Sequence, residues 1–165
     1  MRCACTRARS SPACVPELSA AARELLATAR VAHLATSDQY ARPHVVPVVF
    51  VCRDTVLYTP LDRKPKRDDD WHALRRVRNI ETNGRVAIVV DRYDEDWSHL
   101  AWVLLEGMAA ILESGEERDA AATLLGEKYT QYETLSLEGR PIVRVEIERA
   151  TEWSSETLKD GRPGF

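Results

Sequence analysis

The sequence predicts a mainly β fold: an antiparallel barrel of about six strands with helices packed at its ends. Residues 31–52 read as a hairpin, two apolar runs around a polar turn. Residues 141–148 alternate between apolar and polar side chains, as a strand with one buried face does. Helices and strands do not alternate in the rhythm of a parallel α/β protein, which favours the antiparallel class.

The hairpin at residues 31–52 forms the centre of the predicted barrel. Its second run, residues 45–51, is apolar throughout apart from Pro47, which is typical of a strand covered on both faces. Because proline cannot donate a hydrogen bond to a neighbouring strand, we expect a bulge or a local edge at Pro47. The hairpin therefore predicts a closed or nearly closed barrel.

The first half of the chain is expected to contain two helices and a short strand in addition to the hairpin. Apolar residues at helical spacing predict a helix over about 17–29. A short strand at 56–59 ends at Pro60. The acids 68–70 can cap a second helix, which ends in turn chemistry at Asn83 and Gly84.

The second half is expected to contain long strands. Residues 85–93 read as a buried strand, and residues 100–112 as a longer one in which Gly107 marks a bulge or a close backbone approach. Ser114 and Glu117 have the spacing of a capping box for a helix running to about residue 129. The strand at 141–148 completes the set of six.

Length and charge limit the classes of function. With 165 residues, 44% apolar residues and a net charge of -3, the chain is expected to form one acidic domain over 15–155, with a disordered tail at 1–14 and a loose end at 156–165. This charge gives no general attraction to nucleic acid or to an anionic membrane. No apolar stretch approaches the roughly 20 residues that span a bilayer, and we expect a cytoplasmic protein with reduced thiols.

Motif searches exclude several chemistries. The chain has no G-x-S-x-G elbow, no GxGxxG, no P-loop and no HExxH. Cys3, Cys5 and Cys14 have no partners at zinc-finger spacing, and the acids at 91–96 near His99 match no defined metal loop. We therefore expect no metal site.

Two clusters point to a ligand, although each has a structural alternative. Lys64, Lys66 and Arg67 follow a strand end, and Arg75, Arg76 and Arg78 come soon after. Such a cluster in an acidic protein suits a local anion site, or a solubilising loop paired with the acids 68–70. The four tryptophans can stack on a planar heterocycle, or they can serve core and dimer packing.

Several stretches together resemble the pyridoxamine 5'-phosphate oxidase-like superfamily of split-barrel flavin and deazaflavin proteins. They are RPHVVPV at 42–48, Tyr58-Thr59, the DRKPKR loop at 62–67, and L-x-x-x-R-N-I at 74–80. Arg85-Val86-Ala87 and Glu152-Trp153 continue the agreement. VDRYDEDWSHLAWV and KYTQYE resemble the actinobacterial branch of probable F420-dependent enzymes. The Arg-Leu-x-x-R signature of true pyridoxamine-phosphate oxidases is absent, which argues against that activity.

The resemblance implies a six-stranded split β-barrel of the FMN-binding type, a homodimer, and two cofactor sites at the subunit interface. The cofactor-binding residues it implies are His44, Val45 and Val46 along the ring, Tyr58 and Thr59 at the junction of ring and chain, Lys64, Lys66 and Arg67 at the phosphate, and Trp102 and Trp153 from the second subunit. It implies hydride transfer between bound F420 and a small organic substrate that the sequence does not identify.

Some alternatives stay open at the level of sequence. FMN carries the same ribityl phosphate as F420, so the basic loop does not separate them, although Arg75, Arg76 and Arg78 could meet the acidic tail of F420. The other alternative is a protein that binds flavin or haem without catalysis. His44 and Tyr58 are candidate proton donors, and His44 can equally be a structural histidine.

Overall fold

The computed structural model describes residues 18–61 and 70–155. The predicted ends, 1–14 and 156–165, and the basic residues Lys64, Lys66 and Arg67 lie outside these ranges. Three α-helices occur among the described residues: α1 (Ala20–Thr28), α2 (Arg75–Thr82) and α3 (Glu116–Lys128). Short 3-10 helices lie at Trp71–Ala73, Trp97–His99 and Thr130–Glu133. No helix in the described part of the chain is long and apolar enough to cross a membrane.

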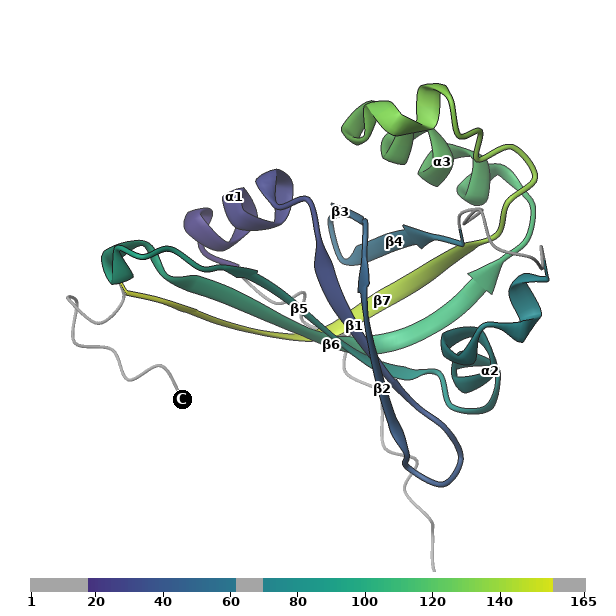
Figure 1. Ribbon diagram of the computed structural model, residues 1–165, viewed down its shortest axis with the longest axis horizontal. Coiled ribbons are helices and arrows are strands. Elements are labelled where there is room, and N and C mark those ends of the chain that lie inside the picture. The colour runs from purple at the N-terminus through teal and green to yellow at the C-terminus, as the bar shows by residue number, and fades with distance from the viewer. Residues whose placement is uncertain (1–17, 62–69, 156–165) are drawn as a thin grey trace, which may run out of the picture.

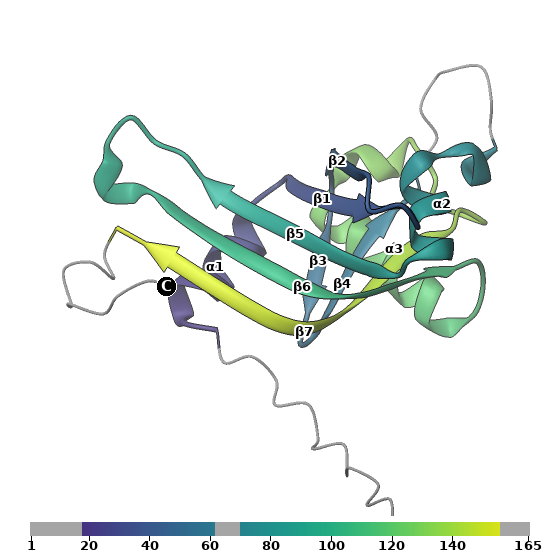
Figure 2. The ribbon, with the colours of Figure 1, turned by 90° about the horizontal axis from the view of Figure 1, so that it is seen from below.

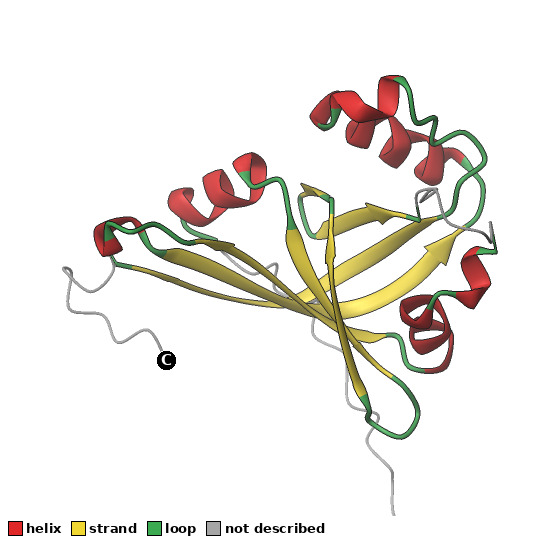
Figure 3. Ribbon diagram, in the orientation of Figure 1, coloured by secondary structure: helices red, strands yellow, loops and turns green. Residues whose placement is uncertain are grey.

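Seven antiparallel strands form one strongly curled sheet (Figures 1 and 3). The strands are β1 (Ala32–Ser37), β2 (Pro43–Val48), β3 (Val51–Arg53), β4 (Val56–Pro60), β5 (Arg85–Arg92), β6 (Ala101–Leu112) and β7 (Ile142–Ser154). Their order in the sheet is β2-β1-β5-β6-β7-β4-β3. The predicted fold class, an antiparallel split barrel, is confirmed, with seven strands in place of six.

The extra strand arises from a break in the predicted hairpin. The apolar run divides at Val49 and Phe50. As a result, β2 is the edge strand on one side of the sheet and β3 is the edge strand on the other. The side chain of Phe50 is fully buried. Its N–H donates to the hydroxyl of Tyr129 at 3.0 Å, and its carbonyl accepts from the same hydroxyl at 2.9 Å. One side chain from the end of α3 thus satisfies the backbone at the point where the barrel splits.

The expectation that both faces of the second apolar run are covered was wrong for β2. Its residues alternate between exposed and half-buried, and Val45 is 58% exposed. β2 pairs with β1 and with no other described strand, so one row of its backbone groups faces away from the ladder. Pro47 lies on this edge strand, as its missing N–H predicts.

Two apolar clusters fill the fold. The larger packs α1 and α2 against the inner face of the sheet, and the smaller packs α3 over β3, β4 and the start of β7. The view from below in Figure 2 shows β5, β6 and β7 crossing the front with no helix before them. No helix of the described part of the chain therefore covers the outer face of these three strands.

Other local predictions had mixed outcomes. The bulge is confirmed, since the β6–β7 register shifts between Glu106 and Gly107. A Cβ at Gly107 would lie 1.9 Å from the carbonyl oxygen of Glu146, so only glycine fits this close approach. The capping box was wrong: Gly115 is the N-cap of α3, with no side-chain cap, and Glu117 bonds to Tyr58 and Arg144 instead. β7 also extends well beyond the predicted end at residue 148.

Candidate functional site

An open groove of about 230 Å³ lies where the barrel splits. One wall is the end of β2 and the bend after it, and the opposite wall is the end of β4. Arg76 of α2 lies at its margin. The lining residues are Val31, Pro47, Val48, Val49, Thr59, Pro60 and Arg76. The apolar walls and one adjoining cation suit a flat, partly anionic molecule.

Thr59 is the polar group of this groove that stands out. Its residue is 2% exposed, and its Oγ1 is buried without a hydrogen-bond partner among the described residues. Buried hydroxyls are nearly always paired, because an unpaired one costs about 1–3 kcal/mol. An unpaired hydroxyl in a groove wall is the arrangement expected where a ligand atom completes the hydrogen bond.

Tyr58 points the other way. Successive side chains alternate across a strand, so Tyr58 lies on the opposite face of β4 from Thr59. Tyr58 packs in the cluster under α3, and its hydroxyl donates to Glu117 at 2.8 Å. Burial and this hydrogen bond raise the pKa of Tyr58. The structure therefore does not bring Tyr58 to the groove.

His44, Val45 and Val46 all lie on the edge strand β2. His44 and Val46 share a face with Val48, whereas Val45 is on the exposed face. The Nδ1 atom of His44 is buried and makes no hydrogen bond with any described residue. Burial lowers the pKa of His44 below 6.5, and the positive charges of Arg75 and Arg76 lower it further. These effects favour the neutral imidazole of His44, whose Nδ1 stays without a partner among the described residues.

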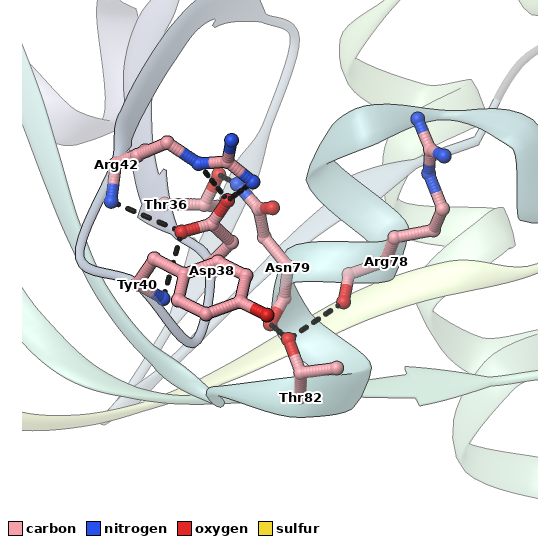
Figure 4. A network of polar contacts seen from close by, with 7 residues as sticks. All are labelled: Thr36, Asp38, Tyr40, Arg42, Arg78, Asn79 and Thr82. Atoms are coloured by element: carbon pink, nitrogen blue, oxygen red, sulfur yellow. Dashed lines mark hydrogen bonds and ion pairs between the residues drawn. The ribbon is translucent and has the colours of Figure 1, made fainter.

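Helix α2 is fixed to the hairpin by two asparagines. Asn79, which is 3% exposed, donates from Nδ2 to Thr36 Oγ1 at 2.9 Å (Figure 4). Asn83 Nδ2 donates to Ser37 Oγ at 3.0 Å. Side chains with buried polar partners hold their elements in one position. These contacts hold the second half of α2 against the end of β1, and the positive charges of Arg75 and Arg76 in its first turn act on His44 of β2.

The two tryptophans lie at the other end of the sheet. Trp102 of β6 and Trp153 of β7 are directly opposite each other in the ladder. They border a hollow under α1, together with Ser19, Leu25 and Glu152. Within one chain they do not meet Thr59. The remaining predicted contacts, from Lys64, Lys66 and Arg67, fall outside the described residues.

Sequence reasoning missed two residues that shape the site. The sequence places Tyr129 at the end of a helix and within KYTQYE, and nothing in its neighbourhood marks a partner 79 positions away. Arg76 was grouped with Arg75 and Arg78, although helical geometry turns it about 100° from Arg75. The helical period was the available signal for Arg76, and no local signal existed for Tyr129.

Comparison with solved structures finds the same fold in proteins of low identity. The heme storage protein HutZ of Vibrio cholerae is 20% identical, with a TM-score of 0.63 over 80% of this chain and 90% of that one. A conserved hypothetical protein of Mycobacterium tuberculosis is 20% identical, with a TM-score of 0.68 over 97% and 96%. A FAD-binding protein of Mesorhizobium loti is 24% identical, with a TM-score of 0.57 over 82% and 94%.

No curated protein sequence matches the chain significantly. The sequence profile of the family described as Pyridoxamine 5'-phosphate oxidase, however, matches residues 18–154. This range contains the whole sheet and all three helices. The chain therefore belongs to the pyridoxamine 5'-phosphate oxidase family.

Proposed function

We propose that the protein binds a flavin-type cofactor, F420 rather than FMN, in the groove at Thr59 and acts as an oxidoreductase on a small organic substrate. The observation that carries this proposal is the unpaired, buried Oγ1 of Thr59 in the wall of the groove. It fits a cofactor that brings polar atoms to an apolar cleft. Family membership supports the flavin class. The preference for F420 rests on the resemblance of residues 90–103 and 128–133 to the F420 branch.

The chain supplies binding and orientation. Thr59 Oγ1 would hydrogen-bond a polar atom of the bound group, and the apolar side chains of Val48 and Val49 would exclude water from its ring. Arg76 would face its negative charge. Backbone groups on the free edge of β2 are available to the ring edge. A bound deazaflavin supplies the hydride chemistry itself.

His44 is the described residue of β2 best suited to exchange a proton, and it lies on the same face of that strand as Val48 of the groove. Its lowered pKa favours the neutral imidazole, and its Nδ1 has no described partner. Tyr58 is a poor candidate, because its hydroxyl is already bonded to Glu117. The phosphate contacts of Lys64, Lys66 and Arg67 remain predictions from the sequence.

The substitution Thr59→Val tests the proposal by two opposite effects. The change removes a buried, unpaired hydroxyl, so the ligand-free protein should become more stable by about 1–3 kcal/mol in urea unfolding. Affinity for the cofactor should fall at the same time, by about tenfold for one lost hydrogen bond of about 1.4 kcal/mol. Thr55→Val, in the β3–β4 turn, is the matched control. A variant that gains stability and binds F420 as tightly as wild type would exclude Thr59 as a contact.

Titration of the purified protein with F420, FMN and haem decides the cofactor. Tight F420 binding with oxidation of F420H2 by quinones or enones supports the proposed enzyme. Tight FMN binding with turnover favours the FMN-dependent alternative. The fold likeness to the heme storage protein HutZ favours a second candidate, haem binding without turnover. Haem binding with no reaction of F420H2 would establish that candidate and refute the enzyme.

We further propose that the protein is a homodimer in which the outer face of the sheet is covered. Val45 is 58% exposed and Met108 39% exposed on this face. Trp102 and Trp153 border a different hollow from the groove at Thr59. A second copy would cover the apolar side chains and offer its tryptophans. Val45→Glu should yield a folded monomer by sedimentation, whereas Leu135→Glu, at an apolar residue after α3, should leave the dimer intact. A monomeric wild type would refute the dimer.

A further inference from the structure

Lys128, the last residue of α3, lies in a cluster that joins α3 to α1 and to the break in the barrel. The members of this lysine cluster are Leu26, Arg30, Phe50, Lys128 and Tyr129. The Nζ atom of Lys128 donates to the carbonyl oxygen of Leu26 in α1 at 3.2 Å. In return, Nη1 of Arg30 donates to the carbonyl oxygen of Lys128 at 2.5 Å. Each of the two cations therefore satisfies a carbonyl group in the last turn of a helix.

The side chain of Lys128 is surrounded by apolar groups and by a second cation. Its Nζ lies over the ring of Phe50, 4.1 Å from the ring centroid, and it makes no ion pair with a carboxylate in residues 18–61 and 70–155. The guanidinium of Arg30 lies 4.4 Å from the centroid of the Tyr129 ring, and Nζ of Lys128 lies 5.7 Å from the same centroid. Cys52 is the other titratable group whose charge acts on Lys128, and burial raises the pKa of its thiol to about 11, so it is neutral at pH 7.

These surroundings favour a neutral, nucleophilic amine. Burial lowers the pKa of Lys128 to about 8, and the positive charge of Arg30 adds to the effect. At pH 7.5 about a quarter of such amines are neutral, against about 0.1% for a lysine with an ordinary pKa near 10.4. Desolvation by apolar groups and a neighbouring cation are the two means by which proteins activate a lysine as a nucleophile. One N–H of the neutral amine is enough for the bond to Leu26, so the lone pair is free to react.

The charge of Arg30 favours an electrophile that gives an anionic product. A positive charge beside the nitrogen disfavours the ammonium form and stabilises a carboxylate in its place. Carbon dioxide is uncharged, is small enough to need no enclosed cavity, and yields a carboxylate when it adds to an amine. Arg30 is exposed and makes no ion pair with a described carboxylate, so its remaining N–H groups are available to such a product.

We propose that Lys128 is a carbon dioxide site, at which Nζ and CO2 form a carbamate that pairs with the guanidinium of Arg30. The lone pair of Nζ attacks the carbon atom, an N–C bond forms, and one C–O π bond opens to give a carboxylate oxygen. One N–H proton leaves to water, and neither an oxidant nor a reductant takes part. The N–H that remains on the carbamate still donates to Leu26. Two like charges are thereby replaced by an ion pair between the end of α3 and the segment after α1.

Chemical trapping tests the carbamate directly. Triethyloxonium alkylates the carboxylate of a carbamate and leaves a stable mass label on the lysine. The full-length protein is treated at pH 7.5 under isotopically labelled CO2 and bicarbonate, and under argon as a blank, and each lysine is then examined by mass spectrometry of its peptides. The label on Lys128 should exceed the label on each other lysine at least about tenfold, because far more of its amine is neutral. The other lysines of the chain are Lys64, Lys66 and Lys159.

Two arginine variants test the partner of the carbamate. Arg30→Gln removes the positive charge that favours both the neutral amine and the anionic product, so the label on Lys128 should fall about twofold to tenfold. Arg23→Gln is the matched control, because Arg23 is also exposed and also donates from Nη1 to a backbone carbonyl, that of Leu18. It should leave the label on Lys128 unchanged.

Stability gives a second measurement that does not depend on trapping. Because the carbamate forms in the folded protein, CO2 at fixed pH and ionic strength should raise the urea midpoint of wild type. Lys128→Arg keeps the charge without a reactive amine, so its midpoint should not respond to CO2. No CO2-dependent label on Lys128, or a label no greater than on the other lysines, would overturn the carbamate. A label that Arg30→Gln leaves unchanged would overturn the pairing with Arg30, and an equal rise of the midpoint in wild type and Lys128→Arg would refute a stabilising ion pair at Lys128.

Discussion

The hydroxyl of Tyr129 should contribute strongly to stability, because it replaces strand pairing at the break in the barrel. It accepts from Phe50 N at 3.0 Å and lies 2.9 Å from Phe50 O and 3.0 Å from Arg30 O. Phe50 is fully buried and Tyr129 is 3% exposed, so water does not replace the lost partner. Tyr129→Phe keeps the ring and its packing, and removes only the hydroxyl.

The expected loss follows from the groups left unpaired. The N–H of Phe50 and one carbonyl lose their partner, and each buried unpaired group costs about 1–3 kcal/mol. We expect the free energy of unfolding to fall by about 2–4 kcal/mol, which lowers Tm by about 5–15 °C in a chain of this size. Urea unfolding with an unchanged m value measures it.

Tyr93→Phe is the matched control, because Tyr93 is 70% exposed. Its free energy of unfolding should change by less than about 0.5 kcal/mol, as is usual at the surface. The same loss in both variants, or a loss below about 0.5 kcal/mol in Tyr129→Phe, would refute the role of the hydroxyl. Because Val49 lines the groove beside Phe50, Tyr129→Phe should also weaken cofactor binding under conditions where the variant is folded.

Three further predictions concern other parts of the fold. Gly107→Ala forces a Cβ against the backbone of β7, so the free energy of unfolding in urea should fall by at least about 1–3 kcal/mol. Gly126→Ala in α3 has open space around the new Cβ and should be neutral or stabilising. Similar effects of the two substitutions would refute the close approach at Gly107. The Tyr58 hydroxyl and Arg144 hold the pKa of Glu117 below its usual value of 4.5, so the free energy of unfolding should decrease as pH falls from 4.5 through this lower pKa. If a Glu117→Gln variant loses unfolding free energy just as steeply over the same pH range, Glu117 is not the cause. Burial lowers the pKa of Lys128 to about 8, and the unfolded chain therefore binds more protons between pH 8 and 10.5. Stability should rise with pH across that range, Lys128→Met should flatten the rise in pH-dependent unfolding, and an identical slope in both proteins would show that Lys128 is not responsible.

The fold class, most of the elements and the family can be predicted from local patterns and motifs in the sequence. Alternation at 141–148 marked part of β7, and Gly107 marked the bulge, because side-chain period and glycine placement are local properties of the chain. The order of RPHVVPV, Tyr58-Thr59 and the later motifs indicated the split barrel. The same residues predicted Thr59 as a site residue, and its unpaired hydroxyl fits that role.

The place where the barrel opens, and the side chains that meet there, follow from contacts between segments that are distant in the sequence. The apolar run at 45–51 reads as one strand, and it divides because Tyr129, far along the chain, satisfies the backbone of Phe50. Tyr58 and Thr59 are adjacent in sequence, yet β4 turns one toward α3 and the other toward the groove. Such outcomes depend on contacts between distant segments, and the local pattern that specifies a strand does not encode them.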